Sequence, residues 1–154
     1  MNKNHNKMLS LLQDNLSLLK TSQATLSQSY EKCKKIGIKK VYTFEQLESF
    51  DSLTSKFART SDIYTQKILI SLFKILREEA DTFLDRVNLS EKLKLITSAD
   101  DLLAIRDIRN QIAHEYKQEK IEELFEDVLE MVDQLFKSFD MTRKFIAEKS
   151  IFQC

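Results

Sequence analysis

The sequence predicts an all-α protein, folded as an antiparallel up-and-down bundle of four long helices with one or two short extra helices. One observation is the near absence of turn residues: the chain has one glycine and no proline, so tight turns and closely spaced hairpins are disfavoured. A second is that apolar residues recur at spacings of three, four and seven along most of the chain, which is the helical period. No repeat, low-complexity tract or linker interrupts this pattern, so residues 1–154 are expected to form a single domain.

The first helix is expected from Met8 to about Tyr30, because leucines at positions 12, 19 and 26 lie on one face. Its stripe can extend to Gly37, the natural C-terminal stop. A second helix should begin after Thr43, with Gln46 as the matching half of a capping box. Its expected buried stripe consists of Phe44, Leu47, Phe50, Leu53 and Phe57.

The pattern breaks around residues 59–62, where Asp62 could either cap a new helix or lie within a bent one. The segment 63–84 is apolar on nearly all sides, which is typical of a central helix or of an oligomer interface. It is expected to end at residues 88–90, and a short helix should follow at 91–96.

Ser98 is the expected N-cap of the next helix, with two carboxylates in its first turn. This helix should end between Tyr116 and Lys120, and a last helix is expected from Ile121. The apolar seam of that last helix is nearly heptad. Its opposite face is acidic, which suits either solvation or a basic partner protein.

Charge and cysteine content narrow the class of protein. The formal net charge is +0, which excludes a strongly basic domain that would bind nucleic acid by bulk charge. A local basic elbow surrounds Gly37; it could hold RNA phosphates weakly or be a solvated loop, and its candidate residues are Lys34, Lys35, Lys39 and Lys40. Cys33 and Cys154 have no metal-ligand neighbours and are expected to be free thiols. No membrane span or signal peptide is predicted, so a soluble cytoplasmic protein is expected.

One stretch contains residues that suggest a chemical function. It is Arg109-Asn110-x-x-x-His114-x-Tyr116, which lies within the helix that follows Ser98. On a helical wheel the isoleucines at 105, 108 and 112 share the core face, while Arg109 and Tyr116 fall at its edge, half-buried. His114 points directly away from the core. Asn110 lies one turn before it and could orient its ring, and Asp107 could influence its charge. Arg106 flanks the group, and the alternative interpretation of His114 is a solvated surface histidine.

An arginine and a histidine without metal ligands suit cleavage of an RNA phosphodiester. The substrate supplies its own nucleophile, the 2′-hydroxyl; His114 can remove its proton, and Arg109 can hold the phosphate and stabilise its developing charge. No metal or cofactor is expected. Arg109 and His114 lie about 140° apart on one helix. Either the long arginine side chain swings round to meet the histidine, or a second copy faces the first across a two-fold axis. The second arrangement predicts a homodimer.

The motif resembles the HEPN superfamily, which is defined by an arginine followed after four to six residues by a histidine. The tyrosine two residues beyond the histidine looks like the HepT toxin branch. This resemblance implies a homodimeric, metal-independent ribonuclease toxin with Arg109 and His114 at a cleft between subunits. It also implies an MntA-like nucleotidyltransferase antitoxin as partner, which would silence the toxin by adenylylation of Tyr116. Many relatives have a small residue after the histidine, whereas this chain has Glu115.

Two other functions remain open on the sequence. One is a non-catalytic HEPN helical binding subunit for a nucleotidyltransferase. The other is a helical adaptor whose motif is only surface polarity.

Overall fold

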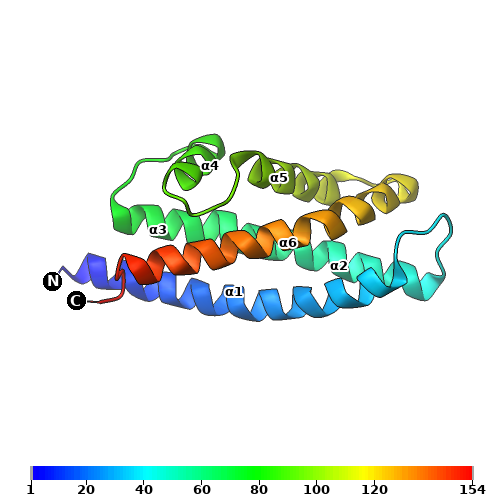
Figure 1. Ribbon diagram of the computed structural model, residues 1–154, viewed down its shortest axis with the longest axis horizontal. Coiled ribbons are helices and arrows are strands. Elements are labelled where there is room, and N and C mark those ends of the chain that lie inside the picture. The colour runs from blue at the N-terminus through cyan, green and yellow to red at the C-terminus, as the bar shows by residue number, and fades with distance from the viewer. Residues whose placement is uncertain (1, 154) are drawn as a thin grey trace.

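The computed structural model describes residues 2–153. Within them every regular element is helical, which confirms the all-α prediction. Figure 1 shows long helices that run back and forth along one axis, with one short helix at the side. The elements are α1 (Lys3–Ile36), α2 (Phe44–Asp62), the π-helix η1 (Ile63–Ile68), α3 (Leu69–Leu76), α4 (Phe83–Lys92), α5 (Ala99–His114) and α6 (Gln118–Glu148).

Helix α1 is longer than the predicted segment and includes almost the whole N-terminal region. The Asn2 side chain accepts a hydrogen bond from the backbone N–H of Asn4 and so caps the first turn. The helix ends at Gly37, as predicted, where a φ of 75° lies in the region that favours glycine.

Helix α2 begins as predicted, with the capping box of Thr43 and Gln46 fully formed. The predicted burial of Phe44 is wrong, because its side chain is 75 % exposed. Phe44 is the first residue of the helix and projects beyond the packed part of the bundle. The rest of the stripe is buried or half-buried.

Asp62 lies within a continuous helical path and does not cap a new helix. Helix α2 passes directly into η1 and then into α3, with helical backbone angles at each junction. The break in apolar period at residues 59–62 lies at the end of α2, directly before the wider turns of η1 shift the helical phase. The apolar residues that follow, including Ile68, Leu69 and Leu72, are buried in the core of the chain, so this segment is a central helix.

The predicted helix from Ile63 to residues 88–90 is wrong, and so is the short helix predicted at 91–96. Helix α3 ends at Arg77, which adopts a left-handed conformation with a φ of 58°. After a loop, α4 starts at a second capping box in which the Thr82 hydroxyl accepts from the Asp85 N–H. The predicted end at residues 88–90 therefore lies inside α4.

Ser98 caps α5, as predicted, by accepting from the backbone N–H of Asp101. Two boundaries differ from prediction: α5 already ends at His114, and α6 begins at Gln118 instead of Ile121. The last apolar seam is confirmed, since Phe125, Val128 and Val132 are fully buried.

Helix α2 packs against α1 on one side and α5 on the other, and α6 covers all three. The rings of Phe50 and Phe125 stack with centroids 4.4 Å apart, and Tyr42 meets both edge-on. These aromatic contacts bind the start of α2 to the start of α6. In residues 2–153 no helix has the length and apolar character needed to cross a membrane.

Candidate functional site

Helix α5 places the motif as the helical wheel predicted over its first three turns. Ile105 and Ile108 are buried against the core, and Ile112 is half-buried. Arg109 follows at the edge of this stripe, where its side chain is 31 % exposed. The buried isoleucines therefore fix the direction in which the arginine leaves the helix.

Arg109 forms a two-point ion pair with Asp62, the last residue of α2. Its Nε donates to Asp62 Oδ1 and its Nη2 donates to Oδ2, both at 2.7 Å. These hydrogen bonds raise the pKa of Arg109 above its already high ordinary value, so the guanidinium is charged at any physiological pH. Both side chains keep about a third of their surface exposed, so the pair adds little stability on its own.

A pocket of about 250 Å³ opens beside this pair, between α5 and the junction of α2 with η1. Helix α5 contributes Arg106, Arg109 and Asn110, and the facing segment contributes Asp62 and Thr65; Ser61, Gln66 and Ile105 complete the lining. The pocket thus gathers two arginines and several polar side chains. Local π-helical geometry often accompanies functional sites of this kind.

Arg106 is held by an aromatic ring from another element. Its guanidinium carbon lies 4.0 Å from the centroid of the Phe83 ring, at the start of α4. Stacking of this kind leaves the in-plane N–H groups of an arginine free to bind an anion. The second arginine of the pocket is therefore oriented by α4, as the first is by α2.

His114 does not line this pocket. It is the last residue of α5 and is exposed to solvent, on the side away from the core as the wheel predicted. The sequence predicts that Asn110 orients the His114 ring. Within the described residues, no hydrogen bond joins Asn110 to His114, so this orientation is not present. Asn110 instead lines the pocket, and Asp107 accepts a hydrogen bond from Gln111 at 3.2 Å. A single chain therefore does not bring Arg109 and His114 together.

Tyr116 is not half-buried at the edge of the helix, as predicted, but 89 % exposed. The wheel placed it one full heptad after Arg109, but α5 ends two residues earlier, so the helical phase no longer applies. Glu115 ends the helix: its carboxylate Oε1 accepts from the backbone N–H groups of Tyr116 and Lys117, at 3.1 and 3.0 Å. The carboxylate next to the motif histidine therefore hydrogen-bonds the backbone of the α5–α6 connection.

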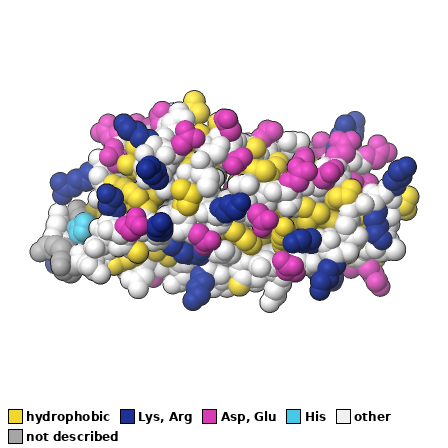
Figure 2. Space-filling view, in the orientation of Figure 1, with side chains coloured by type: hydrophobic (Ala, Val, Ile, Leu, Met, Phe, Trp, Pro, Cys, Tyr) yellow, Lys and Arg dark blue, Asp and Glu magenta, His cyan; other side chains and the backbone are white. Residues whose placement is uncertain are grey.

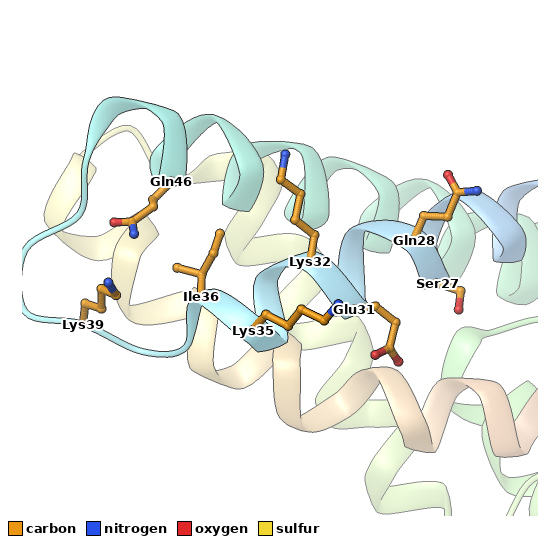
Figure 3. A pocket seen from close by; sticks show the side chains of 8 residues that line it. All are labelled: Ser27, Gln28, Glu31, Lys32, Lys35, Ile36, Lys39 and Gln46. Atoms are coloured by element: carbon orange, nitrogen blue, oxygen red, sulfur yellow. The ribbon is translucent and has the colours of Figure 1, made fainter.

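The four lysines of the predicted basic elbow do not form one surface in the structure. Lys35 and Lys39 line a groove of about 780 Å³ between the end of α1 and the start of α2, together with Lys32 and Glu31 (Figure 3). Lys34 instead lies over the ring of Tyr30, 5.3 Å from its centroid, and Lys40 is exposed outside the groove. The groove carries both signs of charge and lies on the α1 side of α2, whereas the arginine pocket lies on the α5 side.

Acidic side chains gather near the place where α5 meets α6, with basic side chains among them (Figure 2). Exposed carboxylates of α6 contribute to this surface, among them Glu119, Glu123, Glu126 and Asp127. Tyr116 lies in the connection beside them.

Cys33 is a free thiol, as predicted, and is fully buried. Burial raises its pKa to about 11, so the neutral thiol, a poor nucleophile, predominates near neutral pH. Cys154 lies outside the described residues. Across positions 2–153 no three histidine, cysteine or acidic side chains are grouped as a metal site would require.

Asp62 and Phe83 are the site residues that sequence reasoning missed. Each acts on an arginine that lies more than twenty positions away in the chain, and no local spacing relates them. The only available signal was the break in apolar period at Asp62, which marked a special backbone segment without naming its partner. Comparison of the chain with family models, with curated proteins and with solved structures found no match.

Proposed function

We propose that this protein is a HEPN-type ribonuclease toxin that cleaves RNA without a metal ion. The observation that carries the proposal is the pocket on α5 and α2, where Arg106 and Arg109 are each fixed by a partner outside the motif. Two oriented arginines can hold a phosphodiester, and the exposed His114 at the end of the same helix can supply a base. The position of the motif on the third long segment of a helical bundle agrees with the resemblance to HEPN proteins.

In the proposed reaction the ribose 2′-oxygen attacks the adjacent phosphorus, and the bond from phosphorus to the 5′-oxygen of the next nucleotide breaks. His114 accepts the proton of the 2′-hydroxyl, and a proton is returned to the departing 5′-oxygen. Arg109 stabilises the additional negative charge on the phosphate oxygens. The products are a 2′,3′-cyclic phosphate and a free 5′-hydroxyl, and DNA is inert because it lacks the nucleophile.

The proposed active form is a homodimer. A two-fold axis near the end of α5 would bring the exposed His114 of one copy toward the pocket of the other. The proposed regulator is an MntA-like nucleotidyltransferase antitoxin, which transfers AMP to Tyr116. An adenylate there would add bulk and negative charge next to His114 and repel the RNA backbone.

The test is cleavage of an end-labelled RNA by the purified protein in the presence of a chelator. His114→Ala should lower the rate by about 10² to 10⁴-fold, the usual contribution of a general base. His5→Ala is the matched control, since His5 lies on α1 away from the motif, and should cleave at the wild-type rate. Loss of cleavage in chelator, or a His114→Ala variant as active as wild type, contradicts the proposal.

A non-catalytic binding subunit for a nucleotidyltransferase is the second candidate, because the 89 % exposure of Tyr116 makes it reachable whether or not RNA is cut. Growth arrest upon expression separates the two functions. A ribonuclease toxin loses arrest in His114→Ala, whereas a binding subunit shows the same phenotype with and without His114.

A further inference from the structure

The guanidinium of Arg109 is bound along one edge only. A guanidinium carries five N–H groups in one plane, and Asp62 takes the hydrogen of Nε and one hydrogen of Nη2. The other hydrogen of Nη2 and both on Nη1 form a second edge. No hydrogen bond within the described part of the chain uses Nη1, and the side chain lines the pocket.

The fold makes this orientation rigid from both sides. Asp62 sits between buried Ser61 and Ile63, and Arg109 follows buried Ile108 on the facing helix. The backbones that carry the two side chains are therefore fixed by the core. A carboxylate that holds two N–H groups at 2.7 Å restricts a side chain that would otherwise sample many rotamers.

We propose that Asp62 is a positioning residue for Arg109: it fixes one edge of the guanidinium so that the free edge binds a phosphate of an RNA backbone. The proposal rests on the proposed function for the identity of the ligand. It assigns to α2 a part in a site whose recognisable motif lies entirely on α5. Arg106, stacked on Phe83 in the same pocket, supplies a second fixed cation.

The direction in which one substitution changes RNA affinity separates this positioning role from a purely electrostatic effect of the Asp62 charge. Asp62→Asn removes a negative charge beside an anion site, and charge alone therefore predicts tighter binding of RNA. Positioning predicts weaker binding, because an asparagine amide presents one acceptor and a donor group where two acceptors are needed. The two explanations thus give opposite results for the same variant.

The experiment measures binding of a 2′-O-methylated RNA oligonucleotide, which cannot be cleaved, at fixed salt. Asp62→Asn should weaken binding by about tenfold, as expected when an oriented, charge-assisted contact is lost, and Asp62→Glu should restore part of the loss. Asp51→Asn is the matched control. Asp51 is an exposed carboxylate of α2, and it forms no ion pair within the described part of the chain. It should leave binding within about twofold.

Two further measurements tie the effect to Arg109. In an Arg109→Ala background, Asp62→Asn should produce no additional loss, since Asp62 acts only through that arginine. In NMR spectra the Arg109 Nε–H resonance should be protected from exchange in the wild type and lose that protection in Asp62→Asn. Addition of inorganic phosphate should shift this resonance saturably in the wild type alone. Thermal melting of each variant shows that the fold is retained.

Tighter or unchanged binding by Asp62→Asn overturns the proposal, as does a wild-type protein that binds neither the oligonucleotide nor phosphate. These outcomes are distinct from failure of the proposed function. A wild type that binds the oligonucleotide with Asp62-dependent affinity but never cleaves RNA leaves the positioning role standing and removes the ribonuclease.

Discussion

At the scale of single residues, Tyr116 differs from the other tyrosines of the chain in exposure. Tyr64 is fully buried, Tyr30 is nearly so and Tyr42 is half-buried in an aromatic cluster, whereas Tyr116 is 89 % exposed. A modifying enzyme can reach its hydroxyl without unfolding any helix. The early end of α5 at His114 is the cause of this exposure.

Incubation with a nucleotidyltransferase partner and ATP should therefore add AMP to the Tyr116 peptide and to no other tyrosine. Peptide mass spectrometry checks this expectation, and Tyr116→Phe should abolish the mass increase. Cleavage of RNA should fall in proportion to the modified fraction. A modification that persists in Tyr116→Phe contradicts the assignment of the target.

Cys33 permits a prediction about reactivity and pH. Its thiol donates to the Ser49 carbonyl at 3.3 Å, and burial raises its pKa from 9.0 to about 11, against the smaller opposing effect of Lys32 and Lys56. In a Cys154→Ser variant, the remaining Cys33 thiol should not react with a disulfide reagent at pH 8 until denaturant is added. Because the folded state favours the neutral thiol, its contribution to stability is complete below pH 9 and is lost as the pH approaches 11. Rapid labelling of the native variant at pH 8 argues against the buried position.

At the scale of elements, the sequence predicts helices well where periodicity and capping agree, and poorly where the core continues across a boundary. Gly37, Thr43 and Ser98 gave correct ends because each satisfies backbone groups locally. The end of α3 was missed because Arg77 adopts the left-handed conformation without a glycine to signal it. The apolar residues Phe83 and Leu84, at the start of α4, then extended the apolar run of the sequence, so that α4 was predicted as part of the preceding helix.

The same limits apply to the site. Local periodicity correctly placed Ile105 and Ile108 in the core and Arg109 at their edge. It gave the wrong environment for Tyr116, because the phase of a helix is meaningful only as far as the helix extends. It could not find Asp62, since the pair with Arg109 joins two elements 47 positions apart.

The start of α4 gives an element-scale prediction. Thr82→Ala removes the acceptor of the Asp85 N–H and should cost about 1 kcal/mol of stability, as is usual for a lost N-cap. Thr25→Ala is the control, because its hydroxyl only bonds the Ser22 carbonyl within an exposed part of α1; it should change stability by less than about 0.5 kcal/mol. Urea denaturation followed by circular dichroism measures both. Equal midpoints for the two variants contradict the role of the capping box.

At the scale of the whole molecule, a single chain keeps apart the two motif residues that the proposed chemistry needs. Asp62 holds Arg109 on the α2 side of α5, while His114 is exposed at the helix end and does not line the arginine pocket. Five residues of regular helix also turn the two side chains about 140° apart. A site that uses both groups on one phosphate is therefore expected to take them from different copies.

Mixing inactive variants tests this arrangement. In a heterodimer of Arg109→Ala and His114→Ala subunits, one composite site lacks both groups, but the other combines an intact arginine with an intact histidine. If half of the randomly mixed dimers are heterodimers with one working site each, RNA cleavage should recover to about a quarter of the wild-type rate. Mixing either variant with the Arg109→Ala/His114→Ala double variant should restore nothing, because no intact pair can form. Sedimentation analysis establishes that the mixed subunits associate. No recovery in dimers shown to exchange subunits would mean that each site draws its arginine and histidine from the same copy, since such sites remain broken in every pairing.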